Sequence, residues 1–238
     1  FLPNDAGHED QVLPFFANRL MFPYTSRGQV VYFIGRTTPW TERNKYEDKR
    51  KYKKLFAHDP VKYPWIVEGI ANDHLYNEDL LSTRPRTVVI TEGITDCIAL
   101  LAQGFPAISP VTVKFRREDT PRLITRLRGV NEVLICQDNE ISQAGWQGAL
   151  DTAQDLQEAG IPCRIAVLPL GEAQEQARSE LQKRFGIEGR GDGTTLDTRL
   201  AKYTADERRD AQQLLQQAKI DVCQFFRDGG TAADFQAI

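Results

Sequence analysis

The sequence predicts an α/β protein with a parallel sheet flanked by helices, preceded by a smaller β-rich α+β subdomain. From residue 86 onward, short apolar runs alternate with segments of helical period, which is the pattern of β-α-β units. These apolar runs are continuous rather than alternating, as in strands buried on both faces. Before residue 86, β-branched and aromatic residues dominate, which favours antiparallel strands.

In the N-terminal part, assigned to residues 1–84, we expect a β-hairpin formed by residues 19–24 and 28–38. Both segments are dense in β-branched and aromatic residues, and the TSRG between them is a turn signal. A strongly basic stretch follows at residues 43–54. Its aromatic residues could stack on nucleic-acid bases, although such a run is more often only a solvated face.

Residues 85–238 are assigned to a second domain, built on the β-α rhythm. Expected strands are 87–93, 106–110, 132–137 and 162–169, and expected helices are 94–104, 120–129 and 144–160. In the last of these helices, the spacing predicts that Trp146, Leu150 and Leu156 lie on or near one face.

The rhythm is interrupted at residues 171–218, which are rich in Gln, Glu and Arg. We expect a polar, exposed insertion there, with helices around 172–185 and 204–218. The apolar pattern returns at residues 219–235, which are expected to rejoin the sheet.

Bulk composition excludes several classes of protein. The formal net charge is −3, which points to no particular partner. The four cysteines form no C-x-x-C pair, so we expect reduced thiols rather than a zinc knuckle. The sequence has no signal peptide and no apolar stretch approaching the roughly 18 residues of a membrane span. We therefore expect an intracellular, cytoplasmic protein without a membrane partner.

Acidic residues follow two of the predicted strands. Glu92 ends the first strand and Asp96 lies one helical turn later, while Asp138 and Glu140 follow the strand 132–137. The carboxyl ends of parallel strands open onto one edge of a sheet, so these carboxylates should converge there. Asp221 is a further candidate. Singly, each acid could also be a helix-dipole partner or a loop cap.

Clustered carboxylates repel one another, and a cation relieves the repulsion. Sites made of oxygen ligands suit hard ions such as Mg²⁺ or Mn²⁺, which also hold phosphate oxygens. This arrangement is typical of metal-assisted phosphoryl transfer.

Two stretches resemble a known family. TEGITDCIALLAQGFPAIS and VLICQDNEISQAG resemble the Toprim domain of primases, topoisomerases and some nucleases, whose signature is Glu-Gly-x-x-Asp at one strand end and Asp-x-Asp at another. RLMFPYTSRGQVVYFIGRTT, followed by KYKKL, resembles the basic N-terminal half of the bacterial-type DNA primase catalytic core. Order and spacing match over roughly residues 14–170. One departure is that the second motif here reads Asp-Asn-Glu.

The resemblance implies a Toprim-type sheet and a DNA primase that makes short RNA or mixed primers on single-stranded DNA. Its substrates would be a single-stranded DNA template and NTPs. Its partners would be a replicative helicase and a separate zinc-binding domain, and it would be associated with the nucleoid when active. Two or three Mg²⁺ or Mn²⁺ ions would serve as cofactors.

The resemblance also implies roles for individual residues. Glu92 and Asp138 would be catalytic. The metal ligands would be Glu92, Asp96, Asp138, Glu140 and Asp221. The template or nucleotide phosphates would be bound by Arg19, Arg36, Lys51, Lys53 and Lys114.

Two other functions remain open. A Toprim-type metal-dependent nuclease would use the same carboxylates to cut a phosphodiester, and the basic N-terminal half favours the primase over it. A non-catalytic nucleic-acid-binding module is the third reading. The intact acids at positions 92, 96 and 138 argue against it.

Overall fold

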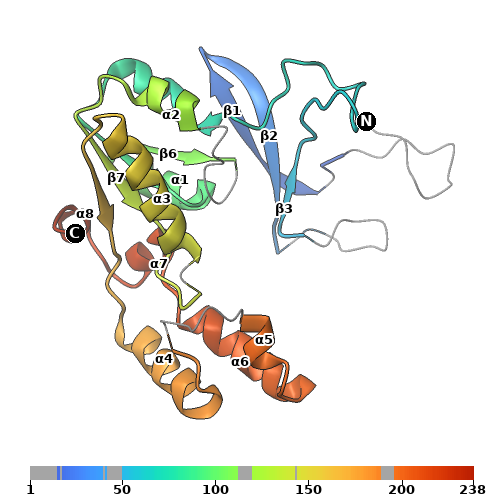
Figure 1. Ribbon diagram of the computed structural model, residues 1–238, viewed down its shortest axis with the longest axis vertical. Helices are drawn as coiled ribbons and strands as arrows, with labels where there is room; N and C mark the ends of the chain where they lie inside the picture. Colours follow the sequence, from blue (N-terminus) through green and yellow to red (C-terminus); the bar gives the residue numbers. More distant parts are fainter. Residues whose placement is uncertain are drawn as a thin grey trace, which may run out of the picture. The chain divides into compact units, whose positions relative to one another are not determined.

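The computed structural model describes residues 15–16, 18–39, 41, 50–111, 120–142, 144–188 and 196–238 (Figure 1). The chain divides into two compact units, Phe1–Asp79 and Leu80–Ile238. The sequence-based boundary was set after residue 84. Each unit is described by itself.

The first unit contains an antiparallel sheet of three strands in the order β1 (Arg19–Ser26), β2 (Gln29–Thr37) and β3 (Tyr52–Lys54). The predicted hairpin is confirmed as β1 and β2. Its two loop residues, Arg27 and Gly28, have φ angles of +53° and +73°. Two left-handed residues form the turn that matches the twist of the flanking strands.

The core of this sheet follows from strand alternation. Phe22 pairs with Ile34, and Tyr24 pairs with Tyr32, so all four side chains lie on one face. All four are buried. The loop end of the hairpin is held by Asp79, which accepts hydrogen bonds from the backbone N–H of Arg27 at 2.5 Å and of Gly28 at 3.0 Å.

The first unit also contains the short strand β4 (Leu75–Tyr76). In the second unit, four neighbouring strands follow the order β6 (Ala107–Pro110), β5 (Thr87–Thr91), β7 (Glu132–Cys136) and β8 (Cys163–Ala166). A short 3₁₀ helix, η1 (Glu78–Thr83), precedes β5. The pairs β6–β5, β5–β7 and β7–β8 are all parallel, which confirms the α/β class. Both faces of β5 and β7 are buried, as their continuous apolar runs predict.

Three helices connect these strands: α1 (Ile94–Ala102), α2 (Thr120–Leu127) and α3 (Ala144–Glu158). The chain runs from β5 to β6 on one side and then returns past β5 to β7 and β8. Right-handed crossovers therefore place α1 on one face of the sheet and α2 and α3 on the other. The packing of α2 on α3, and of α1 on β5 and β6, agrees with this.

The buried face of α3 differs from the sequence prediction. Leu156 is buried, but Trp146 and Leu150 are 41% and 39% exposed. The face that is buried instead consists mostly of small residues at helical spacing: Gly145, Gly148, Ala149, Thr152, Ala153 and Leu156. Small residues allow the helix to approach closely, so the large side chains turn outward.

The insertion forms the predicted helices α4 (Glu172–Phe185) and α6 (Ala205–Gln217), with α5 (Leu196–Leu200) between them. Most of its described side chains are exposed, but α4 and α6 also pack together around a small apolar core. Its buried residues are Ile141, Ala177, Leu181, Phe185, Ile187, Leu200, Ala211 and Ala218.

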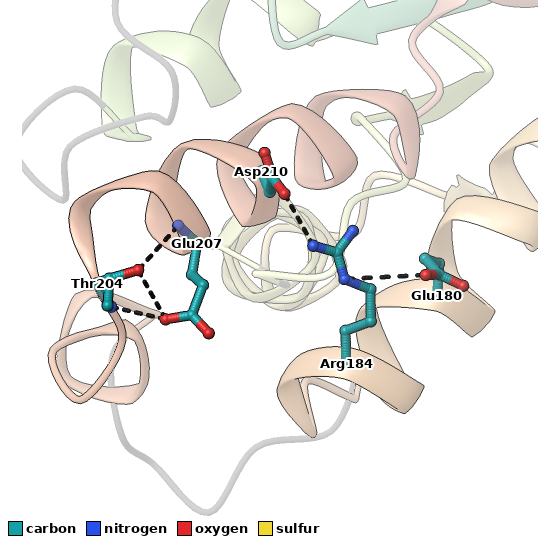
Figure 2. A network of polar contacts seen from close by, with 5 residues as sticks. All are labelled: Glu180, Arg184, Thr204, Glu207 and Asp210. Carbon is teal, nitrogen blue, oxygen red and sulfur yellow. Dashed lines mark hydrogen bonds and ion pairs between the residues drawn. The ribbon is translucent and has the colours of Figure 1, made fainter.

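Polar contacts support the packing of the insertion (Figure 2). Arg184 of α4 bonds to Asp210 of α6 at 2.8 Å. Thr204 and Glu207 form a capping box at the start of α6, with the Thr204 hydroxyl accepting from the Glu207 N–H. Such a cap satisfies backbone donors that would otherwise be unpaired.

Residues 219–235 do not rejoin the sheet as a strand, so that prediction is wrong. Within this segment, only Ile220 forms a β-bridge, an isolated one to Asn139 in the loop after β7. Asp221 then caps the helix α7 (Val222–Arg227), which is followed by α8 (Ala232–Gln236). The Asp221 carboxylate accepts a hydrogen bond from the Gln224 N–H, so a helix begins here instead of a strand.

All four cysteines are free thiols. Within the described part of the chain, no helix is both long and apolar enough to cross a membrane.

Candidate metal centre

Glu92 and Asp138 follow the two central strands of the parallel sheet. Glu92 comes directly after β5, and Asp138 lies two residues beyond the end of β7. These strands are neighbours at the point where the chain's order across the sheet reverses. Ligands of open α/β sheets bind outside the carboxyl ends of the strands at this point. The fold therefore places both acids where a ligand site is expected.

The carboxyl group of Glu92 is largely buried. Its Oε2 atom has no hydrogen-bond partner among the described residues. Burial, followed by the charge of Asp138, raises the pKa of Glu92 to about 7. A buried carboxylate with an unpaired oxygen is unstable when ionised, which favours a proton or a cation at this position.

Gly145, in the first turn of α3, leaves room for Glu92. A Cβ atom at this position would lie 3.1 Å from Glu92 Oε2 and 3.4 Å from the Cβ of Gln137. Sequence reasoning gave Gly145 no role. The sequence feature that could have indicated its role is a glycine at the start of the helix that follows the second acidic motif.

Asp96 lies in the first turn of α1 and is 7% exposed. Its Oδ1 accepts a hydrogen bond from the backbone N–H of Cys223 at 3.2 Å. Burial, then the charges of Asp221 and Asp138, raise the pKa of Asp96 to about 6. The structure thus brings the C-terminal segment onto the first acidic motif.

Gly93 is needed for space rather than for an unusual backbone angle. Its φ is −116°, which any residue adopts. A Cβ atom there would lie only 2.8 Å from Asp96 Oδ2. The Gly-x-x-Asp spacing therefore lets the Asp96 carboxylate fold back over the start of its own helix.

Asp138 forms an ion pair with Lys219, which sequence reasoning missed. The Lys219 Nζ atom contacts Asp138 Oδ2, and the two side chains are 28% and 10% exposed respectively. Burial raises the pKa of Asp138 although the lysine opposes this. Burial disfavours the Lys219 ammonium, but the hydrogen bond and charge of Asp138 outweigh it and raise the lysine's pKa.

Asp221 and Cys223 complete a group of possible metal ligands with Asp96. One carboxylate oxygen from each aspartate and the Cys223 Sγ all lie within 4.8 Å of one another. Asp221 also accepts a hydrogen bond from the Gln224 N–H at 2.7 Å. Burial raises the pKa of the Cys223 thiol to about 12. Sequence reasoning included Asp221 but not Cys223.

Glu140 contributes charge to the same edge of the sheet. Its presence raises the pKa values of both Glu92 and Asp138. Its Oε1 accepts a hydrogen bond from the Ser142 hydroxyl at 2.5 Å. The charges of the five residues expected to hold metal, Glu92, Asp96, Asp138, Glu140 and Asp221, thus influence one another, and we call them the acidic cluster. Among the described residues, only Asp96 and Asp221, together with Cys223, form a group of three with ligand atoms within 4.8 Å of one another.

No model of a known protein family matches the chain, and no curated protein sequence matches it significantly.

The expected phosphate-binding residues of the first unit divide between the faces of its sheet. Lys53 pairs with Gly35, whereas Arg36 pairs with Tyr52, so strand alternation places these two pairs on opposite faces. The Arg36 guanidinium and the Lys51 ammonium lie 5.5 Å and 5.7 Å from the centre of the Tyr52 ring. Tyr52 therefore stands beside two cations.

The other two expected phosphate ligands of this sheet also have contacts. The Lys53 ammonium lies 4.1 Å from the centre of the Phe15 ring. Arg19 donates a hydrogen bond to the Arg50 carbonyl at 3.0 Å. Lys114 lies outside the described residues.

An aromatic group in the first unit was not foreseen. Phe56 and Tyr63 stack at 4.5 Å, and Trp65 packs edge-on against Tyr63 at 5.8 Å. Trp65 is 64% exposed. Its loop is ordered by backbone hydrogen bonds, including that from the His58 N–H to the Ile70 carbonyl at 2.8 Å. An exposed aromatic ring on a loop that is held by backbone hydrogen bonds is suited to stacking on a flat ligand.

Proposed function

We propose that the protein is the catalytic core of a DNA primase with a Toprim-type metal site. It would synthesise short RNA or mixed primers on single-stranded DNA by nucleotidyl transfer. The observation that carries this proposal is the cluster of Glu92, Asp96, Asp138 and Asp221 at the reversal point of a parallel sheet. The basic and aromatic residues of the first unit support a nucleic-acid substrate.

The donor set fits a hard divalent ion, since carboxylate oxygens are the preferred ligands of Mg²⁺ and Mn²⁺. Glu92, Asp138 and Glu140 would hold ions on one side of the cluster, and Asp96 and Asp221 on the other. The unpaired, buried Oε2 of Glu92 is a donor that an ion would satisfy. Two or three bound ions would stabilise charge on the attacking and leaving oxygens of a transferring phosphate.

The side chains of the cluster have further roles in this proposal. Glu92 would also be the residue that accepts the proton of the attacking 3′-hydroxyl. The Lys219 ammonium is positioned beside Asp138 and would help neutralise a phosphate oxygen there.

In the first unit, Arg19, Arg36, Lys51 and Lys53 would bind phosphates of the template or of the incoming NTP. Lys114, in the second unit, is a further candidate for a phosphate contact. Phosphate contacts of this kind make binding strongly dependent on salt concentration. Tyr52, between two cations, would stack on a base. A replicative helicase and a separate zinc-binding domain are the partners that this function implies.

The test is incubation of the protein with a single-stranded template, labelled NTPs and Mg²⁺ or Mn²⁺. We expect short, template-dependent products that are lost in Asp138→Ala and in Glu92→Gln. A control variant, Glu158→Gln, removes an exposed carboxylate at the end of α3 and should retain full activity. Shortened template without new product would instead assign the site to a Toprim-type nuclease. Metal-independent binding of the template without either reaction would indicate a binding module.

A further inference from the structure

Arg178, on helix α4, connects the last residue of the insertion with the loop that follows β7. Its Nε donates a hydrogen bond to the Ala218 carbonyl at 3.0 Å. Its Nη2 donates to both the carbonyl oxygen and the side-chain Oδ1 of Asn139, at 3.1 Å and 2.9 Å. No carboxylate among the described residues pairs with Arg178. The hydrogen bonds of its guanidinium go to uncharged oxygen atoms of these two segments.

Both segments carry residues of the acidic cluster. Asn139 lies between Asp138 and Glu140, and Ala218 directly precedes Lys219, the ion-pair partner of Asp138. One planar guanidinium thus spans the two pieces of chain whose side chains meet at the metal centre. Arginine is suited to this because its donors are held in a rigid fork.

Asn139 connects the same segments by a second set of bonds. Its backbone N–H donates to the Ile220 carbonyl at 2.9 Å, and its carbonyl accepts from the Ile220 N–H at 3.2 Å. Its side-chain Nδ2 donates to the Leu168 carbonyl at 2.8 Å. The middle residue of the Asp-Asn-Glu motif therefore uses all its polar groups, bonding to the backbone of Ile220 and Leu168 and to the Arg178 side chain.

The insertion provides the rigid base for these bonds. Arg178 lies one residue after the buried Ala177 and one turn before the buried Leu181, both in the core of the insertion. Ile141, one residue after Glu140, packs into that same core. The loop of the second acidic motif is thus attached to the insertion by a hydrogen-bonding anchor at Asn139 and an apolar anchor at Ile141.

We propose that the insertion is a clamp for the metal centre, in which Arg178 is a positioning residue. It would hold the loop of Asp138 and Glu140 against the segment of Lys219 and Asp221, so that these side chains converge with the separation that a divalent ion requires. The inference rests on the proposed function in taking the acidic cluster as a metal site. Replacing Arg178 should leave every carboxylate in the chain but weaken the binding of metal by the cluster.

The experiment compares the wild-type chain with Arg178→Gln, Arg178→Lys and a matched control, Arg184→Gln. Arg184 lies on the same helix but bonds only within the insertion, to Glu180 and Asp210 (Figure 2). Mn²⁺ affinity is measured by calorimetry, and folding is monitored by thermal unfolding. Loss of groups that orient metal ligands reduces metal affinity by about 10–100-fold. We expect Arg178→Gln to bind Mn²⁺ about tenfold more weakly, Arg178→Lys to be intermediate and Arg184→Gln to bind as wild type.

A folded Arg178→Gln protein with wild-type Mn²⁺ affinity would overturn the proposal. If Arg178→Gln does not fold, Arg178→Lys is judged by the same comparison with Arg184→Gln. If the wild-type chain binds no Mn²⁺, the proposed function loses its metal centre, and hydrogen exchange then tests the clamp separately. Faster exchange of the Asn139 and Ile220 amides in the Arg178 variant than in Arg184→Gln supports it, and equal exchange overturns it.

Discussion

Lys219 forms an ion pair with Asp138, although the two residues belong to segments separated by the whole insertion. The Lys219 ammonium contacts one oxygen of the Asp138 carboxylate. Without metal, the lysine compensates part of the negative charge that the acidic cluster would otherwise carry alone.

Substitution of Lys219 by Met should destabilise the metal-free protein. Breaking a fully buried ion pair costs about 3–5 kcal/mol, because one charge is left unpaired. Lys219 keeps 28% of its side chain exposed. Solvent screening therefore reduces the expected loss to about 1–3 kcal/mol in the free energy of unfolding. Urea unfolding in the presence of a chelator measures it. Added Mg²⁺ should stabilise the variant more than the wild type, because it supplies the missing positive charge.

The control for this prediction is Lys202→Met, which removes an exposed ammonium beside the ring of Tyr203. This variant should lose little stability and should respond to Mg²⁺ as the wild type does. Equal losses of unfolding free energy in the two variants would show that the Lys219–Asp138 ion pair does not stabilise the protein.

The stability of the metal-free protein should fall as pH rises from about 4 to about 7. Glu92 and Asp96 have pKa values of about 7 and about 6 in the folded chain, above the ordinary values of 4.5 and 3.8. The folded state therefore binds protons more tightly than the unfolded state, and it loses this advantage as the groups ionise. Glu92→Gln should remove part of the slope and stabilise the protein at pH 8 by about 1 kcal/mol, a value reduced for partial solvent screening.

This dependence is measured by urea unfolding at several pH values with a chelator present. Glu158→Gln, at an exposed position of α3, should keep the wild-type slope. A Glu92→Gln protein whose stability varies with pH as steeply as the wild type would contradict the assignment.

Substitution of Gly145 by Ala should weaken metal binding without unfolding the protein. The new Cβ atom would lie 3.1 Å from Glu92 Oε2, so the carboxyl group must move. Alanine also favours a helix over glycine by about 1 kcal/mol, which offsets the steric cost to stability. We expect about a tenfold loss of Mn²⁺ affinity by calorimetry and little change in melting temperature.

Gln147→Ala is the matched control, since Gln147 is exposed on the same helix and bonds to Asp151. Its Mn²⁺ affinity should equal that of the wild type. If Gly145→Ala also binds Mn²⁺ like the wild type, Glu92 is not a ligand at the position that the structure gives it.

Trp65→Ala should weaken the binding of single-stranded DNA. Stacking of a base on an aromatic ring contributes about 1–3 kcal/mol, so we expect a loss of roughly tenfold in affinity. Because Trp65 is 64% exposed, the fold should be unaffected. Fluorescence anisotropy with a labelled oligonucleotide measures the affinity. The control is Val67→Ala, which removes an exposed apolar side chain that cannot stack, and an equal loss in both variants would argue against stacking.

Much of the fold could be predicted because its signals are local. A continuous apolar run followed by Gly and a helical period predicted β5 and α1, together with the placement of Glu92 and Asp96 around Gly93. Periodicity also predicted α4 and α6 to within a residue or two. It did not reveal which face of α3 is buried, because the close fit to the sheet selects small residues and leaves Trp146 exposed.

Asp221 shows the limit of a local pattern. The apolar residues around it suggested a strand, but its side chain caps α7, and only its neighbour Ile220 forms a bridge to Asn139. Cys223 was passed over because a single cysteine in an apolar segment has no spacing signal. Its backbone contact with Asp96 became visible only in the folded chain.

The sequence by itself determined the α/β class, the hairpin, the main helices and the two acidic motifs at the ends of β5 and β7. Each depends on interactions among residues close together in the chain, where backbone sterics, turn geometry and hydrophobic period act directly. Only the tertiary structure decided that Lys219 meets Asp138 and that Arg178 holds Asn139. These contacts join segments far apart in sequence. They depend on how the insertion packs and on where the chain lies after it. A pattern of neighbouring residues does not predict either.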